Sequence, residues 1–318
     1  MRSVSDYPLK TCKVFGVPVL SFDRNQACDL IEHRIANRTP TRVAFLNANL
    51  SLLAIERAEV QQALGDFIVF NDGIGVEIAN RVLNGSRFPA DLNGTDLMPY
   101  LLTRIRRPLR LFLLVGRPQT TDRVVAEFEK RWPWHVVVGH AFCAPNDERS
   151  ALLSQRVAEA KPDIVIIAKG NPNQELWIAE NVPQCAPCAF GVGGLFDFMI
   201  GEAKRAPVWV RVIRMEWMFR LAREPRRLWR RYLIGGMKYG FYIAFGWLTL
   251  RSSWFSGWGR MTGALAANAF GPVSSSSVAG VADGQVMMNH SPPLAPDLEP
   301  SCPRIPASPA ARKPPAGC

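Results

Sequence analysis

The chain has 318 residues, of which 48% are hydrophobic, and it carries a formal net charge of +11. That length accommodates one large domain or two around a sizeable core, and the charge favours polyanionic partners such as nucleic acid, nucleotide-sugars or anionic lipid headgroups. Seven scattered cysteines argue against the disulfide framework of a small secreted protein, and residues 1–19 lack the apolar run of a signal peptide, so we expect a cytoplasmic protein.

Behind a predicted leader at residues 1–12, apolar runs that predict buried strands alternate with segments of helical periodicity through residues 13–206. Strands are predicted at 42–46, 109–115, 135–138, 164–168 and 189–192, and a strand pair at 14–21 has Gly16 and Pro18 in its turn. Helices are predicted at 23–35, 50–57, about 74–83, 97–106, 121–131, 151–160 and 173–181. This alternation predicts a Rossmann-like α/β core, a mostly parallel sheet with helices on both faces.

The composition changes after Pro207. Helices are predicted at 208–224 and 225–233, and the segment from Lys204 to Arg231 holds ten Lys and Arg against two acids. We therefore predict a C-terminal, basic helical appendage at 207–250. Residues 251–318, in which Ser, Pro, Ala and Gly dominate, are predicted to form a disordered tail.

The appendage has the pattern of a helix that lies in a membrane interface. On a helical wheel, one arc holds cations and the opposite arc apolar residues: Arg226, Arg227, Arg230 and Arg231 against Leu228, Trp229, Tyr232 and Leu233. A solvated surface helix is the first alternative, and nucleic-acid binding is the second, for which no recognised fold is present. Segment 232–250 is long enough for a minimal membrane span, but Lys238 and four glycines favour an interfacial or re-entrant element.

A candidate general base, Asp72, lies in the glycine-containing loop at 71–75, at the end of an apolar strand that is predicted within 63–70. Ligands of α/β proteins bind at the carboxyl ends of parallel strands, where an aspartate can accept a proton from a substrate. Aspartate is also among the best helix N-caps, so a capping role is the alternative.

Two further turns have residues suited to holding a phosphate. The turn at 170–175 follows a predicted strand and opens a helix, so its backbone N–H groups could bind phosphate, and Gln174 could reach the same crevice. An ordinary capped turn is the alternative. The turn that begins at Gly191 has glycines at 193 and 194, a spacing that differs from the GxGxxG dinucleotide fingerprint.

Neither a metal site nor a cofactor is predicted. The four histidines are scattered without ligand spacing, and the pair Cys185-x-x-Cys188 has no second pair and no nearby histidine. Packing near a strand is favoured for this pair, and a zinc or redox site is the alternative.

Five stretches occur in a fixed order and spacing: NDGIGV at 71–76, NGTDL at 93–97, GNPNQELWI at 170–178, FGVGGLFDFMIG at 190–201 and the arginine-rich segment at 204–232. In this order and spacing they resemble the WecG/TagA/CpsF family of glycosyltransferases. The resemblance covers roughly residues 13–231. It implies a Rossmann-like core followed by a helical appendage that completes the active site at the membrane.

The resemblance further implies inverting transfer of a sugar from a UDP-sugar to a polyprenyl-diphosphate-linked sugar, without a required metal, at the cytoplasmic face of the inner membrane. Asp72 matches the proposed general base, Asn47 the strand-end asparagine and Gln174 the crevice glutamine. The other residues expected to bind substrate are Asn49, Thr95, Gly193, Arg220, Arg227 and Arg230. Without a metal, helix N-termini and arginines must offset the charge on the leaving diphosphate. The expected partners are the donor, the lipid-linked acceptor and the membrane surface, without nucleic acid; a homo-oligomer is left open.

Two positions depart from the family pattern near the expected donor site. Phe45 stands where threonine is frequent, and Asp91 stands where arginine is common. Specificity for N-acetylmannosamine is therefore not carried over. The motifs FLNAN and LNGTDL resemble more closely the branch that adds glucose to a lipid-linked glucose in xanthan-type exopolysaccharide assembly, so glucose is the expected sugar. The alternatives are an N-acetylmannosaminyl or N-acetylmannosaminuronyl transferase of wall or surface polysaccharide and, in another class, a non-catalytic membrane-anchored nucleotide-binding module.

Overall fold

Six parallel strands form the central sheet of the protein, in the order β4-β3-β8-β7-β5-β6. They are β3 (Thr41–Leu46), β4 (Ile68–Asn71), β5 (Arg110–Val115), β6 (Val136–Phe142), β7 (Ile164–Ala168) and β8 (Cys188–Gly191). The structure, a computed structural model, describes residues 10–142, 150–185, 188–207, 210 and 215–252. The predicted α/β class with a parallel sheet is confirmed.

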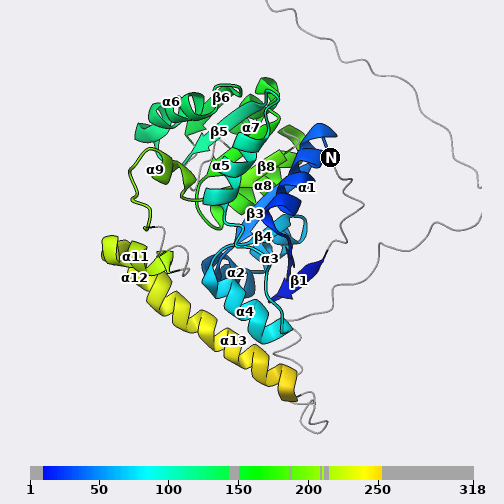
Figure 1. The fold of residues 1–318 in the computed structure, drawn as a ribbon, viewed down its shortest axis with the longest axis vertical. Helices are drawn as coiled ribbons and strands as arrows, with labels where there is room; N and C mark the ends of the chain where they lie inside the picture. The colour runs from blue at the N-terminus through cyan, green and yellow to red at the C-terminus, as the bar shows by residue number, and fades with distance from the viewer. Residues whose placement is uncertain (1–9, 143–149, 186–187, 208–209, 211–214, 253–318) are drawn as a thin grey trace, which may run out of the picture. The chain divides into compact units, whose positions relative to one another are not determined.

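Helices cover both faces of this sheet (Figure 1). One face carries α2 (Ala48–Glu56), α3 (Ala58–Gly65), α4 (Ile74–Asn84), α7 (Ser150–Ala160) and α8 (Asn173–Cys185), and the other carries α1 (Arg24–Ala36), α5 (Gly94–Arg104), α6 (Thr121–Arg131) and α9 (Leu195–Met199). Successive residues of a strand point to opposite faces, so Ala44 and Leu46 of β3 enter one core while Val43 and Phe45 enter the other. Two apolar layers therefore pack against the sheet, one on each face.

Several elements differ from the sequence prediction. Helix α3 was not predicted, and Pro18 lies inside β2 (Val17–Leu20) instead of the turn, which is made by Phe15 and Gly16. A proline is tolerated there because β2 pairs along one edge only, with β1 (Thr11–Val14). Two residues of the predicted leader, Thr11 and Cys12, thus belong to the hairpin. Residues 1–9 of that leader, and the predicted tail from 253 onward, lie outside the described residues.

The C-terminal segment is helical, as α11 (Glu216–Arg223), α12 (Pro225–Trp229), the π-helical turn η3 (Arg230–Ile234) and α13 (Gly235–Ser252). The predicted helix at 208–224 is described only from its second half onward. Helix α13 packs along α2 and α4 (Figure 1). Tyr239 is its anchor: the ring is buried and contacts Phe15 edge-on, with centroids 5.5 Å apart. Gly246 allows the close approach, because a Cβ there would lie 2.9 Å from a methyl of Leu83.

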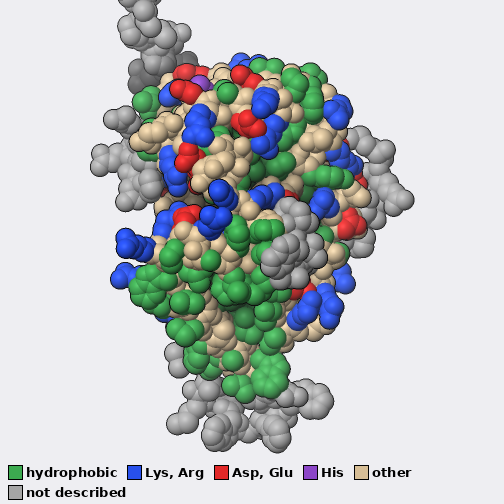
Figure 2. Space-filling model, turned by 60° about the vertical axis from the view of Figure 1, so that its left-hand side comes forward, with side chains coloured by type: hydrophobic (Ala, Val, Ile, Leu, Met, Phe, Trp, Pro, Cys, Tyr) green, Lys and Arg blue, Asp and Glu red, His purple; other side chains and the backbone are tan. Residues whose placement is uncertain are grey.

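The opposite side of this segment is apolar and exposed. Ile234, Met237, Phe241, Phe245 and Leu248 recur every three or four residues, which places them on one helical face. Figure 2 shows hydrophobic side chains gathered over this part of the molecule, with Lys and Arg around them. Among the described helices, none has both the length and the apolar character required to cross a bilayer.

We expect Tyr239→Ala to destabilise the protein by about 3 kcal/mol, because the substitution empties a buried aromatic site between α13 and the core. Met237→Ala, on the exposed face of the same helix, is the matched control and is expected to cost less than about 0.5 kcal/mol. Urea unfolding measures both values, and proteolysis within 235–252 should accelerate only in the first variant. Equal values for the two variants would show that α13 is not held by this contact.

Candidate active site

A cavity of about 1070 Å³ opens at the carboxyl ends of the parallel strands. Each of five strands delivers lining residues from the loop that follows it, among them Asn47 after β3, Asp72 after β4, Gly116 after β5, Lys169 after β7 and Val192 after β8. Loops at this edge form the ligand crevice in open α/β sheets. The appendage supplies the facing wall, from Glu216 in α11 to Ile243 in α13. The site therefore consists of a core half and an appendage half.

Asp72 and Asn47, predicted as base and substrate-binding residue, lie side by side in this cavity. The Nδ2 of Asn47 donates to the Asp72 carboxylate at 3.3 Å, while its Oδ1 accepts from Leu50 N–H at 3.0 Å and so caps α2. One amide is thus fixed at both ends. The alternative role of Asp72 as a helix cap does not hold, because Gly73 occupies the N-cap position of α4 and no side-chain capping bond is found there.

The environment of Asp72 makes it a weaker acid than an exposed aspartate. Burial and the neighbouring Asp91 carboxylate raise the pKa of Asp72 to about 7, against the hydrogen bond from Asn47, which lowers it. A carboxylate whose pKa lies near neutral pH can take a proton from a hydroxyl in a transition state and still be ionised beforehand. This is the property that a general base needs.

The pH dependence of the reaction should follow this carboxylate. Only ionised Asp72 can accept a proton, so kcat/KM is expected to fall as the pH drops through about 7. Asn47→Ser keeps a good N-cap for α2 but removes the donor that favours the charged form. That change raises the pKa, so the acidic limb should move to higher pH by roughly half a unit in pH–rate measurements. A limb at the wild-type position would contradict the assignment of the limb to Asp72.

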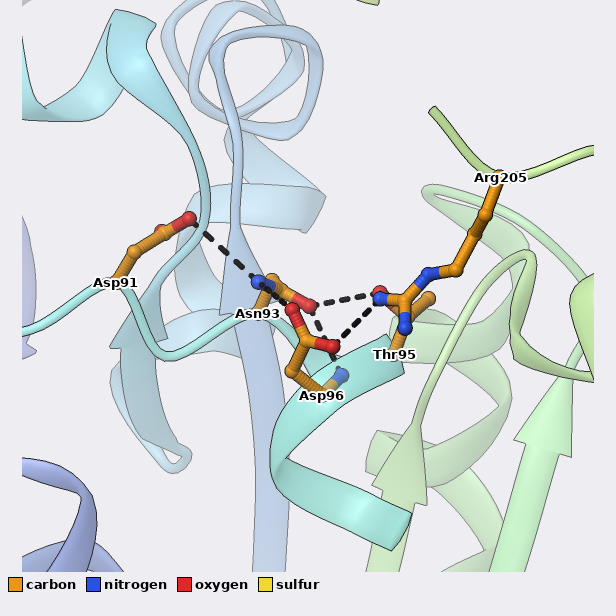
Figure 3. Close-up of polar contacts among 5 residues, drawn as sticks. All are labelled: Asp91, Asn93, Thr95, Asp96 and Arg205. Carbon is orange, nitrogen blue, oxygen red and sulfur yellow. Dashed lines mark hydrogen bonds and ion pairs between the residues drawn. The ribbon is translucent and has the colours of Figure 1, made fainter. Parts of the chain in front are cut away.

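The loop before α5 holds the residue that follows Asp72, and Figure 3 shows the polar contacts within this loop. Asp91 accepts the backbone N–H of Gly73 at 2.8 Å through Oδ1, and its Oδ2 accepts from Asn93 at 3.5 Å. Asn93 in turn caps α5 by accepting from the N–H of Asp96 at 2.9 Å. Asp91, noted from sequence as a departure, therefore holds the glycine that follows Asp72.

Thr95, predicted to bind substrate, lines the cavity and is already held by protein groups. Its Oγ1 donates to Asn93 Oδ1 at 2.7 Å and accepts from Arg205 Nη2 at 3.0 Å. The same Nη2 contacts Asp96 Oδ1 at 2.6 Å, so Arg205 ties the segment after α9 to the start of α5 (Figure 3). Asn49, also predicted, lines the cavity beside Asn47 in the first turn of α2.

Gln174 and Gly193 are brought together, although nineteen residues separate them. The Oε1 of Gln174 accepts the backbone N–H of Gly170 at 3.1 Å and that of Gly193 at 3.2 Å. Both residues line the cavity, but the Gln174 side chain is only 2% exposed. The glutamine thus joins the two glycine turns, and its contact with a substrate stays a prediction.

Three arginines of the appendage line the cavity: Arg220, Arg227 and Arg231. Burial lowers the pKa of Arg231, whose Nε is buried and lacks a hydrogen-bond partner among the described residues. Arg220 lies over the ring of Phe198, 5.4 Å from its centroid, near Gly194. Arg227 forms an ion pair with Glu224 at 2.5 Å. Three cations beside glycine turns are suited to a diphosphate.

Arg230, which the sequence prediction named, is not one of the residues lining this cavity. It is exposed, with its guanidinium 5.4 Å from the Trp229 ring centroid. The π-helical turn at 230–234 has a wider repeat than the α-helix assumed on the wheel, and Arg231 lies against the cavity in its place. Whether Arg230 binds substrate stays a prediction.

Sequence reasoning missed other residues that matter here. Glu175, behind the glycine turns, and Tyr239, which lines the cavity and anchors α13, carried no recognisable signal in their motifs. The aliphatic and aromatic run around Tyr239 gave only the expectation of an interfacial element. Cys188 has a free thiol buried in β8, in agreement with the packing interpretation; the side chain of Cys185 lies outside the described part.

Comparisons with known proteins give one family. Residues 12–253 match the sequence model of the Glycosyl transferase WecG/TagA/CpsF family. A Bacillus subtilis (strain 168) protein, N-acetylglucosaminyldiphosphoundecaprenol N-acetyl-beta-D-mannosaminyltransferase, is 28% identical over 230 residues, which cover 71% of this chain and 88% of the relative. A protein of the same name from Bacillus spizizenii (strain W23) is 32% identical over 181 residues, 56% of this chain and 68% of that relative.

Proposed function

Since this chain belongs to the WecG/TagA/CpsF family of glycosyltransferases, we propose that it transfers a sugar from a UDP-sugar to a sugar linked to a polyprenyl diphosphate. The observation that carries the proposal is the composition of its cavity. A carboxylate with a pKa raised to about 7 faces the same space as three arginines from the appendage. The carboxylate suits a hydroxyl that must lose a proton, and the arginines suit a leaving diphosphate.

The proposed reaction is a single displacement. Asp72 takes the proton of the acceptor hydroxyl as its oxygen attacks the anomeric carbon of the donor, and the bond from that carbon to the diphosphate oxygen breaks. UDP leaves with the electron pair of that bond, and attack from the opposite side inverts the anomeric centre. Arg220, Arg227 and Arg231 offset the charge that develops on the diphosphate, together with backbone N–H groups of the glycine turns.

The lipid part of the acceptor places the enzyme at a membrane surface in this proposal. The exposed apolar face of α13, from Ile234 to Leu248, continues from the cavity wall, which itself includes Leu233 and Met237. Apolar side chains flanked by cations favour binding to the interfacial layer of an anionic membrane. A peripheral enzyme could take its acceptor head group into the cavity while the polyprenyl chain stays in the bilayer.

The first candidate donor is an N-acetylmannosaminyl nucleotide, because both relatives are named as N-acetyl-beta-D-mannosaminyltransferases. These relatives favour the alternative expectation over glucose transfer in exopolysaccharide synthesis. Glucose remains the second candidate for the donor sugar because of one observation. The Phe45 ring closes on Gly94, where a Cβ would lie 2.7 Å from the ring, and it lines the cavity with Asp91 in place of the frequent threonine and arginine.

A panel of radiolabelled UDP-sugars, offered with polyprenyl-diphosphate N-acetylglucosamine and polyprenyl-diphosphate glucose, tests the proposal. Lipid-linked product from one donor is the expected result, and the productive pair identifies the substrates. A non-catalytic nucleotide-binding module would bind UDP-sugars without consuming any of them. Binding without turnover across the whole panel would therefore overturn the proposed transfer.

A further inference from the structure

A fully buried acid lies directly behind the two glycine turns of the cavity. Glu175 is 0% exposed, and its Oε1 accepts from Asn171 Nδ2 at 2.7 Å and from Gln174 Nε2 at 2.8 Å. Its Oε2 is buried and has no hydrogen-bond partner among the described residues. Burial raises the pKa of Glu175 to about 7, against the hydrogen bonds from Gln174 and Asn171, which lower it. An acid kept there at such a cost calls for an explanation other than packing.

The explanation lies in the amide of Gln174. Its oxygen accepts two backbone N–H groups, those of Gly170 and Gly193, and this requires its Nε2 to point the other way, towards Glu175. If the amide were flipped, a donor would face two donors and both glycine N–H groups would lose their partner. The carboxylate oxygen of Glu175 is the acceptor that selects the working orientation.

That orientation has a consequence for the shape of the cavity. Gly170 follows β7 and Gly193 follows β8, and each adopts a positive φ, +81° and +58°. A single glutamine oxygen joins these turns, and Gly191 leaves room for it, since a Cβ there would lie 2.9 Å from Gln174 Nε2. The separation of the two turns is therefore set by a side chain whose own orientation Glu175 sets.

We propose that Glu175 is a positioning residue, which orients the Gln174 amide so that the two glycine turns are held at the spacing that receives the donor diphosphate. The identity of the ligand rests on the proposed function, whereas the series of hydrogen bonds from Glu175 through Gln174 to the two glycines does not. Glu175 itself does not touch the substrate in this proposal. What it supplies is an acceptor at a fixed place, which a neutral amide oxygen can also supply.

Four single variants of the full chain test this. Glu175→Met keeps the volume and removes the acceptor, Glu175→Gln keeps an acceptor, and Gln174→Met removes the link itself. Glu180→Met, on the exposed side of the same helix, is the matched control. Amide hydrogen exchange at Gly170 and Gly193, followed by NMR, reports the link, and calorimetry with UDP reports the site.

In Glu175→Met and Gln174→Met, exchange at both glycines is expected to accelerate about tenfold or more, and UDP should bind about tenfold more weakly. Glu175→Gln should keep exchange and UDP affinity within about twofold of wild type, as should Glu180→Met. Rescue by glutamine separates positioning from a need for negative charge.

The inference would be overturned if the amides of Gly170 and Gly193 exchanged at the wild-type rate in Glu175→Met. It would also be overturned if the wild type binds UDP and Glu175→Met binds UDP with the same affinity. If Glu175→Met does not fold, Glu175→Gln decides: exchange or affinity altered as much as in Gln174→Met overturns the inference, and values near wild type support it. A wild type that neither binds UDP nor transfers a sugar defeats the proposed function instead, and the glycine exchange still tests the link.

Discussion

Asp72→Asn is expected to lower kcat by about 10³-fold or more while the fold stays intact. The substitution keeps the size and shape of the side chain but removes the carboxylate that, in the proposed reaction, takes the proton of the acceptor hydroxyl. Folding should not suffer, because burial already disfavours the charge on Asp72 and raises its pKa to about 7. The variant should therefore unfold at the wild-type temperature or slightly above it, and should still bind UDP.

The matched control is Asp122→Asn, on the exposed surface of α6 away from the cavity, which should turn over at the wild-type rate. Transfer of radiolabelled sugar to the lipid acceptor gives kcat, and thermal unfolding gives stability. Turnover by Asp72→Asn above about a tenth of the wild-type rate would remove Asp72 from the role of base, since general base catalysis contributes 10²-fold at least.

Arg231→Gln is expected to reduce kcat/KM by about 10- to 100-fold, the loss that follows when a charged hydrogen bond to an anion is removed. The guanidinium lines the cavity, and its buried Nε has no hydrogen-bond partner among the described residues, so a bound diphosphate would be its natural acceptor. UDP affinity should fall in parallel if this arginine holds the donor, and should stay unchanged if it holds the diphosphate of the acceptor.

Arg230→Gln is the comparison that decides between Arg230, which the sequence prediction named, and Arg231, which lines the cavity in the structure. This residue carries the same charge one position earlier, but its guanidinium lies over Trp229 and outside the cavity. We expect its kcat/KM to stay within about threefold of wild type on a soluble acceptor analogue. If Arg230→Gln proves the more damaging of the two, the prediction made from the family resemblance is right and the orientation given by η3 is wrong.

Much of the fold could be predicted because the apolar residues of many strands and helices recur with the regular spacing of these elements. The strand at 164–168 is an uninterrupted apolar run, the strand at 109–115 is apolar apart from Arg110, and the helix predicted at 121–131 has its observed bounds. Helix α3 could not be predicted from the sequence, because it is eight residues long and buries only Val60 and Leu64, which are too few positions to establish a helical period. Pro18 was placed in a turn because an edge strand that pairs on one side cannot be recognised from its residues.

Some residues of the candidate site could likewise be predicted from the sequence, and others could not. Asp72 and Asn47 follow predicted strands, so the topology of a parallel sheet brings them to one edge. Arg231 could not be chosen over Arg230, because a helical wheel places both on the same arc; the structure has a π-helical turn there, and Arg231 is the one that lines the cavity. No pattern in the sequence distinguished Glu175, and only the three-dimensional contacts show that it faces inward towards Gln174.

The bond from Asn47 to Asp72 also has a consequence for how an acceptor can approach. Because the Asn47 amide donates to Oδ2, and capping of α2 prevents that amide from turning away, the two oxygens of the carboxylate are not equivalent. In the proposed reaction Oδ1 is the oxygen left to receive the proton, so the acceptor sugar would present its hydroxyl along one edge of the carboxylate. The choice of the reacting hydroxyl would then depend partly on a helix cap, which selects the direction of approach before any substrate arrives.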